Sequence, residues 1–211
     1  MLKDINWVKP AEIEKESFRL ISQLLGARSF DPWHEPVIKR VIHTTADFDY
    51  ADSLVFNENA VQRGIAAIKN GCHLVTDTRM AEAGINKKVL GIFGGQVQCY
   101  MDRADIIEKA QALGVTRAAL CMDQAVLDPQ CQIFVIGNAP TALIRLYELI
   151  MASQVQPELV IGVPVGFVNV VEAKAMMKNA PVPYIIAEGR KGGSNVAAAI
   201  VNALLYMANN G

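Results

Sequence analysis

The sequence predicts an α/β fold, with three α/β/α layers in which helices cover both faces of a mostly parallel sheet. Three observations support this prediction. The 211 residues are 52% apolar, short strand-like runs alternate with helical segments through the second half, and no repeat or linker divides the chain. Strands that alternate with helices form parallel sheets through right-handed crossovers. We therefore expect a single domain spanning residues 1–211.

The first half of the chain begins with two amphipathic helices. Pro10 opens the first, over residues 11–25, and Gly26 ends it. Pro36 lies in the first turn of the second, a short helix whose apolar spacing leaves His43 at its C-terminal end. The segments expected next are a strand at 53–56, a helix at 59–69, a strand at 73–76, a helical turn at 78–83, a strand at 96–99, and helices at 104–113 and 117–126.

The second half of the chain alternates regularly between strand and helix. The strands are expected at 133–136, 159–163 and 184–187. The helices are expected at 140–152, 168–178 and 194–208. This half supplies most of the parallel sheet, because each helix can cross over to the next strand.

Composition excludes several classes of protein. The chain has 20 basic and 21 acidic side chains, so no overall field attracts nucleic acid or an anionic membrane. No apolar run approaches the roughly 20 residues of a membrane span, and no leader precedes the fold, so we expect a soluble cytoplasmic protein. The four cysteines lack C-x-x-C spacing, which favours small buried side chains over disulfides or a structural metal site: Cys72, Cys99, Cys121 and Cys131.

The stretch from Arg40 to Asp52 is the most polar part of an otherwise apolar region. After His43 come two threonines and three aspartates within ten residues. The carbonyl end of a helix favours a positive charge, so His43 could act as a proton donor. The alternative is that His43 hydrogen-bonds the last carbonyls of its helix, and spacing alone slightly favours that capping role.

Polar, glycine-rich segments follow four of the predicted strands, at residues 76–79, 137–141, 164–169 and 188–194. In an open parallel sheet these segments meet at one edge, where such folds bind ligands. Two of them lead into helices, whose first amide groups suit a carboxylate or phosphate. Arg79, Arg190 and Lys191 add positive charge. Each glycine alone could serve backbone geometry, but the four segments together predict an anion-binding cleft.

Motifs of the common nucleotide, hydrolase and zinc sites are missing. The chain has no G-x-x-x-x-G-K-[ST], no G-x-G-x-x-G, no G-x-S-x-G and no H-E-x-x-H. We therefore expect neither a dinucleotide cofactor nor a resident metal. His73 lies in a predicted strand and should be structural, and His34 has no evident partner in sequence.

Five motifs, in this order and at these separations, together resemble the precorrin-8X methylmutase family, including its cobalt-precorrin-8 form. They are Arg40–Thr45 with Asp47 and Asp52, Thr76–Met80, Gly137–Leu143, Gly162–Val168 and Gly189–Ser194. The resemblance runs from about Ile13 to the last helix. Only the segment from Ile92 to Met122 matches little.

The resemblance implies an isomerase of cobalamin biosynthesis that moves a methyl group from C-11 to C-12 of a corrin precursor without a cofactor. It also implies a homodimer with the site near the subunit interface. His43 would be the general acid that protonates a ring nitrogen of this tetrapyrrole substrate. The expected substrate-binding residues are Thr76, Arg79, Asn138, Arg190 and Lys191. Arg117 could be contributed by a second subunit, but we expect it on a solvated helix face.

Two other functions fit parts of the pattern. A corrinoid carrier would use the same cleft but would not convert its ligand, so only turnover separates it from an isomerase. A nucleotide-binding α/β domain is the third hypothesis, and it rests on sheet topology alone.

Overall fold

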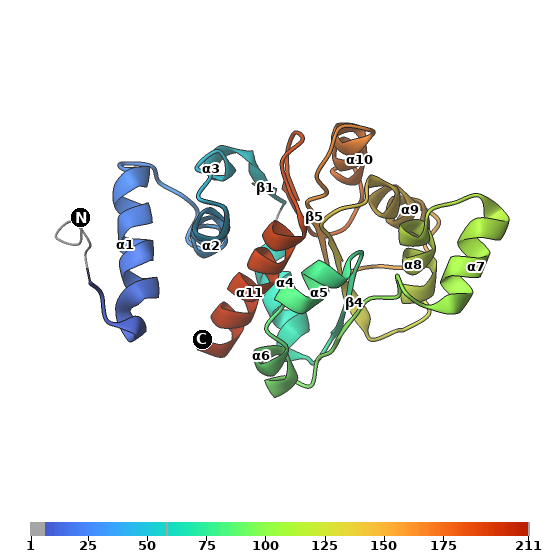
Figure 1. Ribbon diagram of the computed structural model, residues 1–211, viewed down its shortest axis with the longest axis horizontal. Helices are drawn as coiled ribbons and strands as arrows, with labels where there is room; N and C mark the ends of the chain where they lie inside the picture. The colour runs from blue at the N-terminus through green and yellow to red at the C-terminus, as the bar shows by residue number, and fades with distance from the viewer. Residues whose placement is uncertain (1–6, 58, 211) are drawn as a thin grey trace.

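A six-stranded sheet forms the centre of the computed structural model, which describes residues 7–57 and 59–210 (Figure 1). The strand order is β1-β6-β5-β4-β2-β3. All neighbours pair in parallel except β1, which lies antiparallel to β6 at one edge with Leu54 opposite Ala187. The strands are β1 (Leu54–Phe56), β2 (His73–Thr76), β3 (Val97–Gln98), β4 (Cys131–Ile136), β5 (Leu159–Gly162) and β6 (Tyr184–Ala187).

The helices follow the predicted order closely. A short 3-10 helix (Pro10–Glu12) precedes α1, where one continuous helix was expected. The helices are α1 (Ile13–Leu25), α2 (Glu35–Thr45), α3 (Tyr50–Ser53), α4 (Ala60–Lys69), α5 (Arg79–Gly84), α6 (Lys87–Ile92), α7 (Ala104–Leu113), α8 (Arg117–Ala125), α9 (Pro140–Met151), α10 (Val170–Met177) and α11 (Ser194–Asn210). Two short helices, α3 and α6, were not predicted, because four and six residues show little helical periodicity.

Helices cover both faces of the sheet and confirm the predicted three layers. Side chains alternate along each strand, so Ile133 and Val135 pack in one core with α2, α4 and α11. Phe134 and Ile136 point the other way and pack with α8, α9 and α10. In Figure 1, α1 lies outermost on the α2 side, and α7 lies at the opposite end of the molecule.

The loops at the carboxyl ends of the parallel strands meet along one edge, as the sequence analysis expected. We call this edge the strand-end ridge and define it as residues 76–79, 137–141, 163–169 and 188–194. Hydrogen bonds join the loops sideways. The Thr78 and Ser194 hydroxyl oxygens are 2.7 Å apart. The Gly193 amide donates to the Val163 carbonyl oxygen at 2.9 Å.

Asp77 makes three of these connections, between the ends of β2 and β4. Its carboxylate is 1% exposed and accepts from the amides of Gly137, Asn138 and Ala139 at 2.8, 2.8 and 2.7 Å. Burial raises the pKa of Asp77, and the three N–H donors oppose that shift. The expectation of free amides at this turn was therefore wrong, because the protein's own carboxylate occupies them.

We expect Asp77→Ala to lower the free energy of unfolding by about 3 kcal/mol or more, since it leaves three buried N–H donors without an acceptor. Urea unfolding followed by circular dichroism at pH 7 measures the change. Asp102→Ala is the control, because that carboxylate is exposed and its ion pair with Arg79 should contribute at most about 1 kcal/mol. Equal effects of the two substitutions would contradict the anchoring role of Asp77.

Candidate active site

His43 lies in the last turn of α2 with its imidazole exposed. The ring stacks on Phe18 of α1, with centroids 5.3 Å apart and planes 20° apart. Neither ring nitrogen has a hydrogen-bond partner among the residues that the structure describes. The Ala46 amide and the Thr45 hydroxyl bond carbonyls of the last turn instead, so the capping alternative for His43 is wrong.

Lys191 connects the end of α2 to the strand-end ridge. Its ammonium lies 2.6 Å from a carboxylate oxygen of Asp47 and 2.6 Å from one of Asp49. The two carboxylates raise the pKa of Lys191, and Lys191 in turn lowers the pKa of Asp47. Asp47 follows His43 by four residues, so this contact brings the end of the helix that carries His43 to the ridge.

Arg190 differs from the other predicted cations because it forms no ion pair with any described residue. Its side chain is exposed, and the guanidinium carbon lies 6.0 Å from the ring centroid of Phe167. Phe167 is itself 85% exposed. The ridge thus presents an unpaired positive charge beside an open aromatic face.

The other three predicted substrate-binding residues also lie on the ridge, but the side chains of two of them already bond other groups of the protein. Thr76 is fully buried, and its hydroxyl donates to the Thr78 carbonyl oxygen at 3.0 Å. Arg79 bonds the carboxylates of Asp102 and Glu82 at 2.8 and 2.7 Å, which raise its pKa. Asn138 is exposed. Substrate contact by all three stays a prediction.

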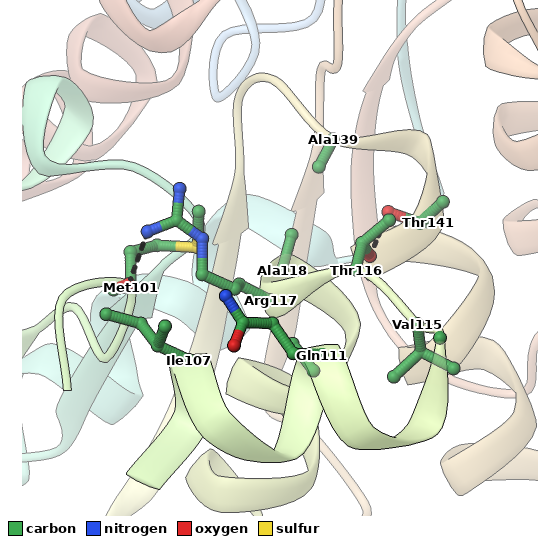
Figure 2. A pocket seen from close by; sticks show the side chains of 11 residues that line it. Met101, Ile107, Gln111, Val115, Thr116, Arg117, Ala118, Ala139 and Thr141 are labelled. Atoms are coloured by element: carbon green, nitrogen blue, oxygen red, sulfur yellow. Dashed lines mark hydrogen bonds between the residues drawn. The ribbon is translucent and has the colours of Figure 1, made fainter. Parts of the chain in front are cut away.

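A pocket of about 710 Å³ opens between α7, α8 and the start of α9 (Figure 2). Figure 2 shows Arg117 extending from the start of α8 toward Met101, whose carbonyl oxygen accepts from it at 3.2 Å. Thr116 faces Thr141, with their hydroxyl oxygens 2.8 Å apart. Ala139 lines the same pocket, so it adjoins the ridge.

Arg117 was expected on a solvated helix face. The side chain is exposed, but it also forms part of this pocket wall. Thr116 caps α8 by accepting from the Ala119 amide at 3.2 Å, which fixes Arg117 in the first turn. The pocket depends on how three helices pack, so the sequence alone did not indicate it.

The cysteines behave as predicted: all four are buried and free. Burial raises the pKa of Cys72 to about 12, which keeps its thiol protonated. Within the described ranges, no three His, Cys, Asp or Glu side chains gather closely enough to hold a metal ion. Over the same ranges, no helix is long and apolar enough to cross a membrane.

A family model described as precorrin-8X methylmutase matches residues 12–207, nearly the whole chain. The chain belongs to the precorrin-8X methylmutase family. It is an isomerase of cobalamin biosynthesis, and the resemblance seen in the five sequence motifs is confirmed.

Similar proteins agree with this assignment over most of their length. Cobalt-precorrin-8 methylmutase of Salmonella typhimurium is 46% identical over 94% of this chain and 95% of its own. The protein of that name from Priestia megaterium is 42% identical over 97% and 91%. A crystal structure of precorrin-8X methylmutase from Thermus thermophilus has a TM-score of 0.87 and 39% identity, and it covers 94% of this chain and 98% of its own.

The loop that carries Arg190 passes very close to the loop after β5, and Gly192 permits this approach. A Cβ atom at Gly192 would lie 2.2 Å from the Val163 carbonyl oxygen and 2.7 Å from that of Pro164. Both are backbone atoms, which cannot move aside as a flexible side chain could. The conformation of the loop therefore requires glycine at this position.

We expect Gly192→Ala to lower the free energy of unfolding by about 2 kcal/mol, because the methyl group overlaps two backbone carbonyls. Gly91→Ala in α6 is the matched control, since a Cβ atom there meets nothing within 4 Å. That substitution should leave stability unchanged or raise it by up to about 1 kcal/mol. Thermal unfolding of both variants measures the difference, and a stable Gly192→Ala would contradict the close approach.

Proposed function

We propose that this protein moves a methyl group from C-11 to C-12 of precorrin-8X or cobalt-precorrin-8, with His43 as the general acid. The observation that carries the proposal is the state of His43, which is exposed, unpartnered within the described residues and joined through Asp47 and Lys191 to the strand-end ridge. The names of the similar proteins from Salmonella typhimurium and Priestia megaterium support the choice of substrate.

The proposed role of His43 is to protonate a ring nitrogen while the methyl group migrates. The bond from the methyl carbon to C-11 breaks as the bond to C-12 forms, so the reaction needs no oxidant or reductant. Substrate and product are isomers, so the donated proton is balanced by one that the macrocycle releases. A positioned acid typically accelerates a reaction about 10²- to 10⁴-fold, so the remaining rate acceleration must come from holding the macrocycle in a reactive conformation.

The strand-end ridge is proposed to bind the carboxylates of the substrate. Arg190 has the best support, because no carboxylate of the described chain occupies it. Lys191 and Arg79 would have to exchange their own carboxylates for those of the substrate. Asn138 would contribute its exposed side chain, and Thr76 would hold the turn that leads to Arg79. Cobalt, if present, would arrive inside the macrocycle.

We also propose a cytoplasmic homodimer in which each site uses both subunits. Arg117 was expected on a solvated helix face, but it also lines a pocket on the α8 side of the sheet, whereas His43 lies on the α2 side. A site that combines the two residues would therefore take Arg117 from the second copy, which is the alternative that the sequence left open. The outer face of α1 exposes Ile13, Leu20 and Leu24, at 51%, 45% and 72%. Apolar side chains that recur on one helix face suit contact with a second copy.

We expect wild-type protein to change the visible spectrum of precorrin-8X, because moving the methyl group alters ring conjugation. His43→Ala should bind the pigment and convert it at least about 100-fold more slowly, given the usual effect of a general acid. Stopped-flow absorption with enzyme in excess measures both.

His34→Ala is the matched control for this experiment, because His34 lies at the start of the same helix and stacks on Phe56 instead. It should turn over at nearly the wild-type rate. Equal rates for wild type and His43→Ala would overturn the acid role. Binding without conversion by wild type would mean that the protein is a corrinoid carrier.

We expect a heterodimer of His43→Ala and Arg117→Ala subunits to keep about half of the wild-type activity, because one of its two shared sites is then intact. Two affinity tags isolate the heterodimer after co-expression. Each homodimeric variant should be nearly inactive. A heterodimer as inactive as its parents would contradict a site that combines His43 of one copy with Arg117 of the other.

A further inference from the structure

Lys174 in α10 is a buried cation without a carboxylate partner among the described residues. Lys174 is only 2% exposed. The ammonium nitrogen donates to the carbonyl oxygens of Gly189 and Lys191 at 2.9 and 2.8 Å. Burial lowers the pKa of Lys174 to about 8. A buried lysine is unfavourable compared with an apolar side chain of similar volume, so its presence calls for a specific role.

The two carbonyls that Lys174 binds stand on either side of Arg190. The carbonyl of Arg190 itself accepts from the Gly166 amide at 3.2 Å. The three consecutive carbonyls of residues 189–191 therefore all accept hydrogen bonds, two of them from one ammonium group. Gly189 permits the turn, with φ of 72° in the left-handed region. The side chain of Arg190 remains exposed.

We propose that Lys174 is a positioning residue that fixes the loop backbone so that Arg190 is presented to a carboxylate of the substrate. This inference rests on the proposed binding of a polycarboxylate tetrapyrrole at the strand-end ridge. Lys174 does not touch the substrate, because it is covered by the loop that it holds. It lowers the entropic cost of binding by keeping Arg190 in place before the substrate arrives.

A double-mutant cycle with Arg190 tests the proposal. Arg190→Ala and Lys174→Met should each raise KM about tenfold, as expected for losing hydrogen bonds to a charged group, and change kcat much less. The double variant should have nearly the KM of Arg190→Ala, because Lys174 acts through Arg190. Lys178→Met, one turn later in the chain, removes only an exposed ion pair with Glu188 and should leave KM within about twofold.

Hydrogen exchange of the ligand-free protein provides a second measurement. Lys174→Met should accelerate exchange of the amides at 190–194, while Lys178→Met should not. Hydrogen exchange needs no substrate. If wild-type protein showed no turnover, the proposed function would be refuted, but the effect of Lys174 on the loop could still be measured. If Lys174→Met does not fold, Lys174→Gln, which keeps one donor group, is used in its place. An unchanged KM in a folded variant, or additive effects in the cycle, would overturn the proposal.

Discussion

The three hydrogen bonds to Asp77 from the turn between β4 and α9 are the constraint on which the candidate site depends. They fix the end of β4 to the end of β2 at the edge where ligands of parallel sheets bind. They also occupy the amide groups that would otherwise suit an anionic ligand at this helix terminus. The proposed recognition of substrate carboxylates therefore relies on side chains further along the ridge, where Arg190, unlike Arg79 and Lys191, has no ion pair with a described residue.

Asp77 and Lys174 are buried side chains of opposite charge that are stabilised in the same way. Each is buried, and each is satisfied by backbone dipoles instead of a charged side chain. Asp77 accepts from three amides, and Lys174 donates to two carbonyls. Backbone partners cannot change rotamer, so both charges hold their loops more firmly than a surface ion pair would. A rigid ridge suits a reaction in which much of the acceleration comes from orienting a flexible macrocycle.

The sequence predicted the fold well because its local patterns were strong. The apolar run His73–Thr76 has the bounds of β2 itself, and Gly26 and Gly114 end their helices with positive φ. The position of His43 at the C-terminal end of its helix also followed from helical spacing. What could not be predicted were the partners supplied by other segments. Asp102 engages Arg79 only because the loop after β3 returns to α5.

The arrangement around Arg190 matches two features that a corrin precursor combines. Its conjugated ring is apolar, and its rim carries acetate and propionate groups. The exposed ring of Phe167 suits the conjugated ring, and the guanidinium 6.0 Å from the Phe167 centroid suits a carboxylate at the rim. Neither group alone selects such a ligand, since exposed arginines and aromatic side chains are common. In the proposed complex, the position of Arg190 relative to Phe167 would provide the selectivity, and the hydrogen bonds from Lys174 hold the loop that carries Arg190.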